Sequence, residues 1–273
     1  MITVIILTYN EEINVRNALE NMAGWAGENI LLDSFSEDNT LEIARNFPVK
    51  IYQRKFDNYA NQRNYAIKEI EKKNEWMLFL DADEVLTNEL KLEIKRVIPT
   101  TNLDGFFLKR RFYFMGKWIK HGGYYPVKIL RLFKWRKAEC ERHINEHIHI
   151  SGNCGELKND FIDNNRKTFY DWVEKHNKYS NFESLQFSRP SDNNANLFGN
   201  STQRKLWVRD NIWNQILPPL FRPFIFFIYI YFIRMGFLDG KVGFIYHFMH
   251  GLVYRFMIDV KYIEKFKLTN IQK

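Results

Sequence analysis

The chain has 273 residues, of which 45% are hydrophobic and 26% are charged. This length allows one large domain, or a catalytic domain of about 200 residues with an appendage, and the charged fraction excludes a simple membrane channel. Only two cysteines are present, Cys140 and Cys154, so a disulfide framework is excluded and a reducing compartment is expected. The N-terminal apolar run lacks a basic flank and a cleavage site, so it is not typical of a signal peptide.

The net charge of +8 is concentrated near the C-terminus. From Thr202 onward the chain has 11 Lys or Arg and 4 Asp or Glu. These basic residues are interleaved with long aromatic and aliphatic runs, a pattern that favours contact with an anionic membrane surface. A basic tail also occurs in nucleic-acid binders, but no nucleic-acid-binding motif accompanies it, so we expect no nucleic-acid partner.

Strands and helices alternate over the first hundred residues. Continuous β-branched or apolar runs predict buried strands, and helical patterns with start and stop signals lie between them. The predicted strands are 2–7, 29–33, 49–53 and 76–80, and the predicted helices are 11–22, 40–46, 59–72 and 87–98, the last with Thr87 as its N-cap. This alternation predicts an α/β fold with a mostly parallel sheet flanked by helices.

The rest of the chain reads differently. Residues 105–150 have a mixed, strand-like pattern, and residues 165–189 are helical. We expect a catalytic domain over 1–190, a polar linker over 191–203 and a basic, aromatic helical region over 204–273. The uncharged runs 224–233 and 242–254 are shorter than the roughly 20 residues that a membrane-spanning helix needs. They predict helices that lie in the membrane interface or dip into it.

Polar residues follow three of the predicted strands. They are Thr8 to Glu11, Asp33 to Asp38 and Asp81 to Glu84. In open α/β sheets ligands bind beyond the carboxyl ends of the strands, so these segments predict a common binding site. Within it, Asp81-Ala82-Asp83 offers two carboxylates to a hard cation such as Mg²⁺ or Mn²⁺, which substrate phosphates usually complete. The same tripeptide also suits a turn that starts a helix.

Other side chains near these ends have two interpretations each. Asp33 and Ser34 can contact a base and a ribose, or they can form a turn that caps the next helix. Arg63 and Arg131 can hold a diphosphate, because guanidinium groups match phosphate oxygens, or they can be ordinary solvated arginines.

Glu146 lies in the polar pentad His143-Ile144-Asn145-Glu146-His147. A carboxylate near the reacting centre can act as a general base toward an acceptor hydroxyl, and it can equally be a surface residue between strands. The pentad also has the spacing of a zinc hydrolase motif, H-x-x-E-H. That chemistry needs a helix, whereas the alternation of isoleucine and histidine from Ile144 to Ile150 favours a strand.

These motifs together resemble family 2 glycosyltransferases with the GT-A fold. The segments that carry the resemblance are Thr8-Tyr9-Asn10-Glu11, Asp33 to Asp38, Gln62-Arg63-Asn64 and Asp81-Ala82-Asp83-Glu84. A narrower likeness, to bacterial lipopolysaccharide core β-1,4-glucosyltransferases, comes from Gly122 to Pro126, Leu130 to Phe133, Ile144-Asn145-Glu146, Arg234 to Gly240 and Gly243-Phe244. Asn145 and Val127 depart from this branch, which usually has His and often an acidic residue there.

The resemblance implies a nucleotide-diphospho-sugar transferase fold and a role for each matching residue. Residues implied in nucleotide-sugar binding are Thr8, Tyr9, Asn10, Glu11, Asp33, Ser34, Arg63, Asp81, Ala82 and Arg131. Asp83 is implied as the ligand of Mg²⁺ or Mn²⁺, and Glu146 as the base of an inverting transfer. The implied donor is a UDP-sugar, and the implied acceptor is lipid-linked or a surface glycan at the cytoplasmic face of the inner membrane. A non-catalytic sugar-nucleotide or membrane-binding protein is the alternative.

Overall fold

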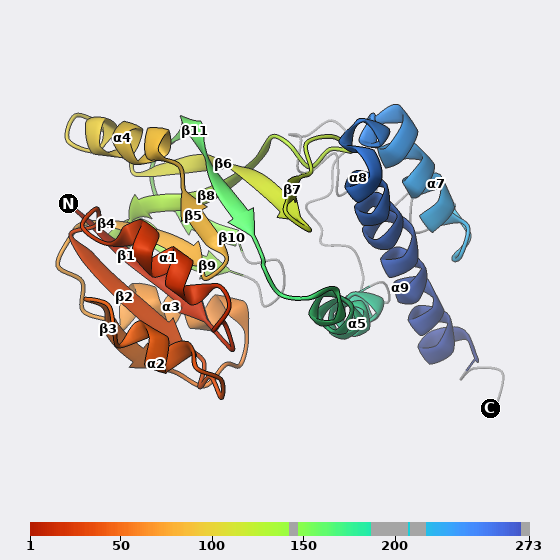
Figure 1. Cartoon of the computed structure of the whole chain (residues 1–273), viewed down its shortest axis with the longest axis horizontal. Coiled ribbons are helices and arrows are strands. Elements are labelled where there is room, and N and C mark those ends of the chain that lie inside the picture. The colour runs from red at the N-terminus through yellow and green to blue at the C-terminus, as the bar shows by residue number, and fades with distance from the viewer. Residues whose placement is uncertain (142–146, 187–206, 208–216, 269–273) are drawn as a thin grey trace. The chain divides into compact units, whose positions relative to one another are not determined.

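The computed structural model describes residues 1–141, 147–186, 207 and 217–268, and the chain divides into two compact units (Figure 1). The first unit comprises residues 1–120 and 124–167, and the second comprises residues 121–123 and 168–273. The predicted division at a linker over 191–203 lies outside the described residues. The division by contacts comes earlier, at Thr168, because the helix that follows packs with the C-terminal helices.

In the described part of the first unit, a nine-stranded sheet has the order β3-β2-β1-β4-β8-β6-β11-β5, with β7 paired to β6. Its strands are β1 (Ile2–Thr8), β2 (Glu28–Asp33), β3 (Lys50–Gln53), β4 (Trp76–Asp81), β5 (Glu84–Leu86), β6 (Gly105–Phe114), β7 (Lys117–Trp118), β8 (Val127–Lys134) and β11 (Cys154–Asn164). A separate two-stranded sheet joins β9 (Ala138–Glu141) and β10 (His147–Ile150).

The sheet is mixed, so the expectation of a mostly parallel sheet is corrected. The half made of β3, β2, β1 and β4 is parallel, and its continuous apolar strands suit burial on both faces. The other half contains the antiparallel pairs β4–β8, β6–β8, β6–β7 and β5–β11. Parallel neighbours need long crossovers, whereas a short loop can only reverse the chain. No helix separates β6, β7 and β8, so these strands alternate in direction.

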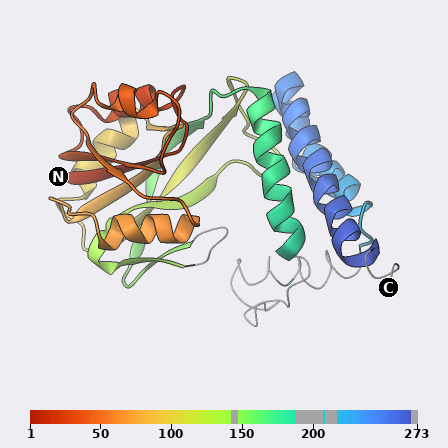
Figure 2. The same cartoon turned by 90° about the horizontal axis from the view of Figure 1, so that it is seen from below.

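Helices cover both faces of this sheet, as Figure 2 shows with α3 on the side opposite α1, α2 and α4. Their bounds are α1 (Val15–Met22), α2 (Thr40–Ala44), α3 (Tyr59–Lys68) and α4 (Asn88–Val97). One core joins α1, α2 and α4 to alternate residues of β1 and β4, and the other joins α3 to the intervening residues. The alternation follows from the two-residue period of a strand.

Two helix ends show what the sequence pattern detected and what it did not. Thr87 caps α4 as expected, because its hydroxyl accepts from the Leu90 N–H at 3.2 Å. Helix α3 ends at Lys68, four residues before the predicted end. There the ammonium of Lys72 donates to the carbonyl oxygens of Ala66 and Ile67 at 2.9 and 2.7 Å, which satisfies groups that a helix end leaves open.

The second unit is helical in its described part. It contains α5 (Phe169–Gln186), α7 (Arg222–Ile228) continued by a wider helical turn to Ile233, and α8 (Gly240–Tyr246) continued through residues 247–253 into α9 (Tyr254–Ile263). Helix α5 packs on α9, and α7 packs on the segment 247–253. The helices expected over 224–233 and 242–254 are therefore present and longer than predicted.

No single helix in the described residues has both the length and the hydropathy of a membrane span. The segments Arg222–Ile233 and Gly236–Phe266 meet that criterion only as a pair, by length and composition, and they are bent by 70° at the break between them. Met235 at this break has a left-handed backbone with φ of 58°.

Candidate nucleotide-sugar site

Three of the predicted polar segments meet at one edge of the sheet. Thr8 pairs with Asp33 across β1 and β2, and Leu7 pairs with Asp81 across β1 and β4. Parallel strands end at the same edge, so Thr8, Asp33 and Asp81 lie on adjacent strands. The expected clustering is confirmed.

Asp33 is fully buried and organises the loop that follows β2. Its carboxylate accepts from the Thr8 hydroxyl at 3.0 Å, the Ser36 N–H at 2.8 Å and the Gln53 amide at 3.3 Å. A buried carboxylate is stabilised by such bonds. Asp33 therefore forms a turn through its bond to the Ser36 N–H, as one of its two interpretations expected. Contact between Asp33 and a base stays a prediction.

The loop after β1 is bonded to the loop after β2. Asn10 has a left-handed backbone with φ of 53°, its N–H donates to the Ser36 hydroxyl at 2.9 Å, and its side-chain oxygen accepts from the Glu37 N–H at 2.9 Å. The Glu11 N–H donates to the Thr40 hydroxyl at 2.7 Å. Tyr9 is exposed beside them. Asn10 and Glu11 thus shape the rim, and Tyr9 presents a ring to solvent.

Asp81 is held between two buried arginines. Arg63 of α3 donates to Oδ1 at 3.3 Å, and Arg131 of β8 donates to Oδ2 at 2.8 Å. The Asp81 side chain is 39% exposed while both guanidinium groups are almost completely buried. Arg63 also lies over the Phe79 ring. Two predicted phosphate-binding arginines therefore meet at the first carboxylate of the Asp81-Ala82-Asp83 motif.

Glu84 is a site residue to which the sequence analysis assigned no role. One carboxylate oxygen accepts from Arg131 at 2.5 Å, and the other accepts from the Asp81 N–H at 2.9 Å. Burial raises the pKa of Glu84 to about 8, against the attraction of Arg131. Burial by itself lowers the pKa of Arg131. The neighbouring carboxylates of Asp81 and Glu84 have the larger combined effect, so the pKa is raised. Glu84 fixes the turn after β4. The sequence feature that could have indicated this role is its place directly after Asp83.

Ala82 and Asp83, the other two residues of the Asp81-Ala82-Asp83 motif, differ in burial. Ala82 is buried in the core with α1 and α4, so only its backbone is available to a nucleotide. Asp83 is half-buried, and its carbonyl oxygen accepts from the Asn164 N–H at 2.9 Å. Among the described residues no group of three His, Cys, Asp or Glu can hold a metal. Mg²⁺ needs only one or two carboxylates when substrate phosphates and water complete its shell, so Asp83 fits such an ion.

Gln62 was also missed as a positioning residue. Its amide donates to the Ser34 hydroxyl at 3.1 Å and accepts from Arg54 at 2.9 Å. It is buried on α3, whose first turn is capped by the Asn58 side chain through the Asn61 N–H. The helix thereby anchors Ser34 at the mouth of the site. The sequence around Gln62 carries no signal that separates this role from that of an ordinary solvated glutamine.

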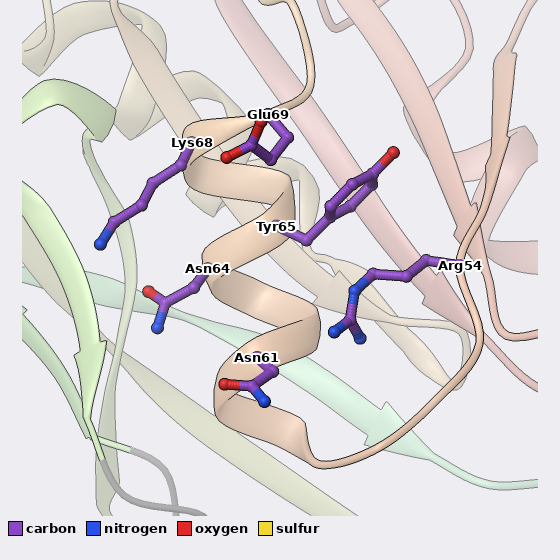
Figure 3. A pocket seen from close by; sticks show the side chains of 6 residues that line it. All are labelled: Arg54, Asn61, Asn64, Tyr65, Lys68 and Glu69. Atoms are coloured by element: carbon purple, nitrogen blue, oxygen red, sulfur yellow. The ribbon is translucent and has the colours of Figure 1, made fainter.

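A shallow pocket of about 250 Å³ lies on the outer side of α3, away from Arg63. Figure 3 shows its lining side chains, most of which project from successive turns of the helix; they are Arg54, Asn61, Asn64, Tyr65, Lys68 and Glu69. Lys68 is already paired with Glu139 at 2.6 Å, and Arg54 with Asp57 at 2.9 Å. Because its cations are neutralised, we assign no ligand to this pocket.

The predicted base, Glu146, lies outside the described residues. So does His143 of the alternative zinc motif. His147, the second histidine of that motif, begins strand β10, whereas H-x-x-E-H requires a helix. The zinc interpretation receives no support from this strand.

Residues 3–164 match the family model described as Glycosyl transferase family 2. The chain belongs to this family. The match covers the whole of the predicted site, from β1 to the end of β11.

Several proteins named as glycosyltransferases are similar to this chain over part of its length. An uncharacterized glycosyltransferase of Rickettsia typhi is 30% identical over 154 residues, which are 55% of this chain and 52% of the relative. The SPbeta prophage-derived glycosyltransferase SunS of Bacillus subtilis is 35% identical over 100 residues, which are 35% of this chain and 23% of the relative. The match thus spans about half the length, or less, of these curated relatives.

The fold of this family 2 chain is similar to that of mannosyltransferase PcManGT from Pyrobaculum calidifontis, whose structure holds GDP-Man and Mn²⁺. The TM-score is 0.52 at 13% identity, over 97% of this chain and 87% of the other. At this identity the likeness concerns the fold. It agrees with a GT-A-like arrangement of a mixed sheet between helices, followed by C-terminal helices.

Proposed function

We propose that this family 2 chain is an inverting glycosyltransferase that moves a hexose from a UDP-sugar onto a lipid-linked, lipopolysaccharide or other surface-glycan acceptor. The observation that carries the proposal is the arrangement around Asp81. A half-exposed carboxylate stands at the carboxyl end of β4 between two buried guanidinium groups, beside the loops of Asp33 and Asn10. This combines a ligand-binding edge of an α/β sheet with charges suited to a nucleoside diphosphate.

Each residue then has a part in holding the donor. The rim formed by Tyr9, Asn10 and Ser34 receives the nucleoside. Arg63 and Arg131 orient Asp81 and place positive charge where the diphosphate lies, which favours the anionic leaving group. Glu146 removes the proton of the acceptor hydroxyl, as the family resemblance implies.

Asp83 is the proposed ligand of Mg²⁺ or Mn²⁺. Its position in the turn that Glu84 holds, and the preference of these ions for carboxylate and phosphate oxygens, support this assignment. When bound, such an ion neutralises charge on the departing diphosphate.

We also propose that the second unit associates with the cytoplasmic face of the inner membrane. Large apolar side chains are exposed along α7 and the helical segments that follow it; they are Phe221, Phe224, Ile225, Ile228, Tyr229, Phe232, Ile233, Met235, Phe237 and Leu238. Many large apolar side chains exposed within one segment of 18 residues, from Phe221 to Leu238, support an interfacial contact. Arg234 and Lys241, both exposed, add positive charge suited to anionic lipids.

The test is release of nucleotide from a panel of UDP- and GDP-sugars, with and without Mn²⁺, in the presence of detergent and lipid acceptors. We expect UDP release from one donor only, and its loss in Asp83→Asn. Glu146→Gln should keep UDP binding and lose transfer. Nucleotide binding without any turnover would indicate a non-catalytic binding protein, and the absence of both binding and turnover would refute the proposal.

A further inference from the structure

A second group of charged and aromatic side chains lies in the first unit, apart from the contacts around Asp81. Arg111 of β6 donates through Nε to the buried carboxylate of Asp160 at 2.6 Å. The hydroxyl of Tyr125 donates to the same carboxylate at 3.2 Å, and Lys109 lies 3.8 Å from it. One carboxylate therefore accepts from two donors and forms an ion pair with Lys109.

Trp118 holds two cations beside this carboxylate. The Arg111 guanidinium lies 5.1 Å from the centre of the indole ring, and the Lys120 ammonium lies 5.4 Å from it. Tyr125 meets the same indole edge-on at 5.1 Å. Cations at this distance from an aromatic face are attracted by its electrons, so Trp118 fixes the place of both charges.

The cluster keeps an excess of positive charge. In the part of the chain that the structure describes, Asp160 is the one carboxylate that pairs with Lys109 and Arg111, and Lys120 adds a third positive charge. Among the described residues none accepts a hydrogen bond from the two terminal amino groups of Arg111, and none pairs with Lys120. Arg111 and Lys120 are partly or fully exposed, so these donors are accessible to a ligand. A guanidinium fork with unused donors matches a phosphate or a carboxylate.

Strand register places this cluster on the same face of the sheet as Asp81. Phe79 of β4 and Phe107 of β6 both pack toward the core of α3. Every second residue of a strand faces the same side of the sheet. Asp81 therefore shares a face with Phe79, and Lys109 and Arg111 share that face with Phe107. Leu78 is level with Phe106 through Leu132 of the intervening β8, and the pairing of β6 with β8 shifts by one residue after Phe106. Asp81 is therefore level with Lys109 to within about one residue. Two strand spacings, about 10 Å, separate the strands.

Trp118 ends strand β7, and the residue that follows it is bonded back to β6. The Ile119 N–H donates to the Phe112 carbonyl at 2.9 Å. This bond and the ring contact between Trp118 and Tyr125 order both side chains before a ligand arrives, which lowers the entropy cost of binding.

We propose that Arg111 and Lys120, positioned by Trp118 and Asp160, form an anion subsite for the acceptor, and that the acceptor carries a phosphate or carboxylate group. The assignment of the anion to an acceptor rests on the proposed glycosyltransferase function. The subsite faces the same side of the sheet as Asp81, so an acceptor anchored there by its anionic group extends toward the donor. A neutral acceptor would leave the excess cationic charge without a partner.

The test compares glucose 6-phosphate with glucose, titrated calorimetrically into the full chain with UDP and Mn²⁺ saturating. Saturation keeps the phosphate out of the donor site. We expect the phosphorylated sugar to bind at least about tenfold more tightly, as one charge-assisted hydrogen bond provides. This preference should largely disappear in Arg111→Gln and fall in Lys120→Gln. Lys117→Gln, which removes an exposed lysine from the same loop region, is the matched control and should keep it.

Equal binding of the two sugars, or a preference that survives in both Arg111→Gln and Lys120→Gln, would overturn the subsite. Lys120 is exposed and its replacement leaves the fold intact, so a folding defect at Arg111 would not obscure the result.

Binding to vesicles with anionic lipids is measured in parallel. If vesicle binding depends on Arg111 and glucose 6-phosphate binding does not, the site takes lipid headgroups and the acceptor assignment is wrong. If UDP fails to bind but the Arg111-dependent preference remains, the proposed function fails and the anion site stands.

Discussion

The Nδ1 atom of His121 lies 2.7 Å from Oδ1 of Asp239, and the backbone N–H of the same histidine donates to the other oxygen at 2.9 Å. Asp239 is buried, and Nε2 of His247 lies 3.5 Å from it on the other side. Two sequence motifs 118 residues apart, His121-Gly122-Gly123 and the segment around Gly236 to Gly240, thus form one packed structure. Gly122 and Gly236 both lie against the His247 ring, where an added Cβ would come within 2.2 and 2.7 Å of it.

Gly122→Ala is predicted to destabilise the second unit. A methyl group at Gly122 would lie 2.2 Å from Cε1 of His247, and the backbone φ there is +71°. His247 is fully buried, so the ring cannot easily move away. We expect a loss of about 3 kcal/mol or more in the free energy of unfolding, measured by urea denaturation, from overpacking and backbone strain together.

Gly116→Ala is the matched control for this prediction. Its φ is +75°, but nothing lies within 4 Å of the added methyl group. It should show only the cost of the left-handed backbone, about 1 kcal/mol. Equal losses at the two glycines would show that the contact with His247 contributes nothing.

Asp259→Asn should disrupt the pairing of α7 with α9. Arg222 and Asp259 are both buried, with the guanidinium Nε 2.8 Å from Oδ1, and the carboxylate also accepts from the Leu220 N–H at 2.9 Å. Removing one charge leaves the other in an apolar setting, which costs about 3–5 kcal/mol. Thermal unfolding followed by circular dichroism measures the loss. The exposed pair Lys178–Glu174 is the control, and Glu174→Gln should change stability by less than about 0.5 kcal/mol.

Stability should fall as the pH is lowered from 7 to 5. Burial lowers the pKa of His176 to about 4, and its ring stacks on Trp172 with 3.7 Å between centres. Between pH 6.5 and 4 the unfolded chain binds more protons at this residue, so protonation favours unfolding. The expected contribution is about 2 kcal/mol at pH 5.

His176→Phe keeps a flat ring on Trp172 and removes the titrating group. In urea denaturation at pH 7 and pH 5, the variant should lose that part of the pH dependence. Burial also lowers the pKa of His247, so some dependence in the same direction remains. An unchanged difference between the two pH values would contradict the role of His176.

Arg131→Lys should weaken nucleotide binding and stability together. Arg131 Nη2 donates both to Asp81 at 2.8 Å and to Glu84 at 2.5 Å. A lysine ammonium has neither the reach nor the planar fork of a guanidinium. We expect a loss of about 2–4 kcal/mol in stability, since a buried network is left incompletely paired, and weaker UDP binding in calorimetry. Arg16→Lys, at an exposed pair with Glu20, is the control and should change neither quantity.

Much of the site was predictable because its signals are local. The apolar runs that end in Thr8, Asp33 and Asp81 determine where the strands stop, and parallel pairing then brings those ends to one edge. The cap at Thr87 is similarly read from neighbouring residues. The family motifs added an order of segments that the structure reproduces in β1, β2, α3 and β4.

Other features depended on contacts between distant residues. The mixed direction of the sheet follows from how β8 and β11 insert beside β6, which residue alternation does not specify. Glu84 and Gln62 were missed because their partners, Arg131 and Ser34, are 47 and 28 positions away. The pairing of His121 with Asp239 across 118 positions could not be inferred from either motif alone.

The sequence by itself determined the α/β pattern, the polar strand ends and the aromatic, basic C-terminal region, because each arises from periodicity and composition within a short segment. The tertiary structure decided which charges meet. It brought Arg63 and Arg131 to Asp81 and buried Asp33 and Glu84. It also paired Arg111 Nε with Asp160, and it left the terminal amino groups of Arg111 and the ammonium of Lys120 without a carboxylate partner among the described residues. The physical reason is that burial and pairing of charge depend on which strands become neighbours, and that is decided by packing of the whole chain.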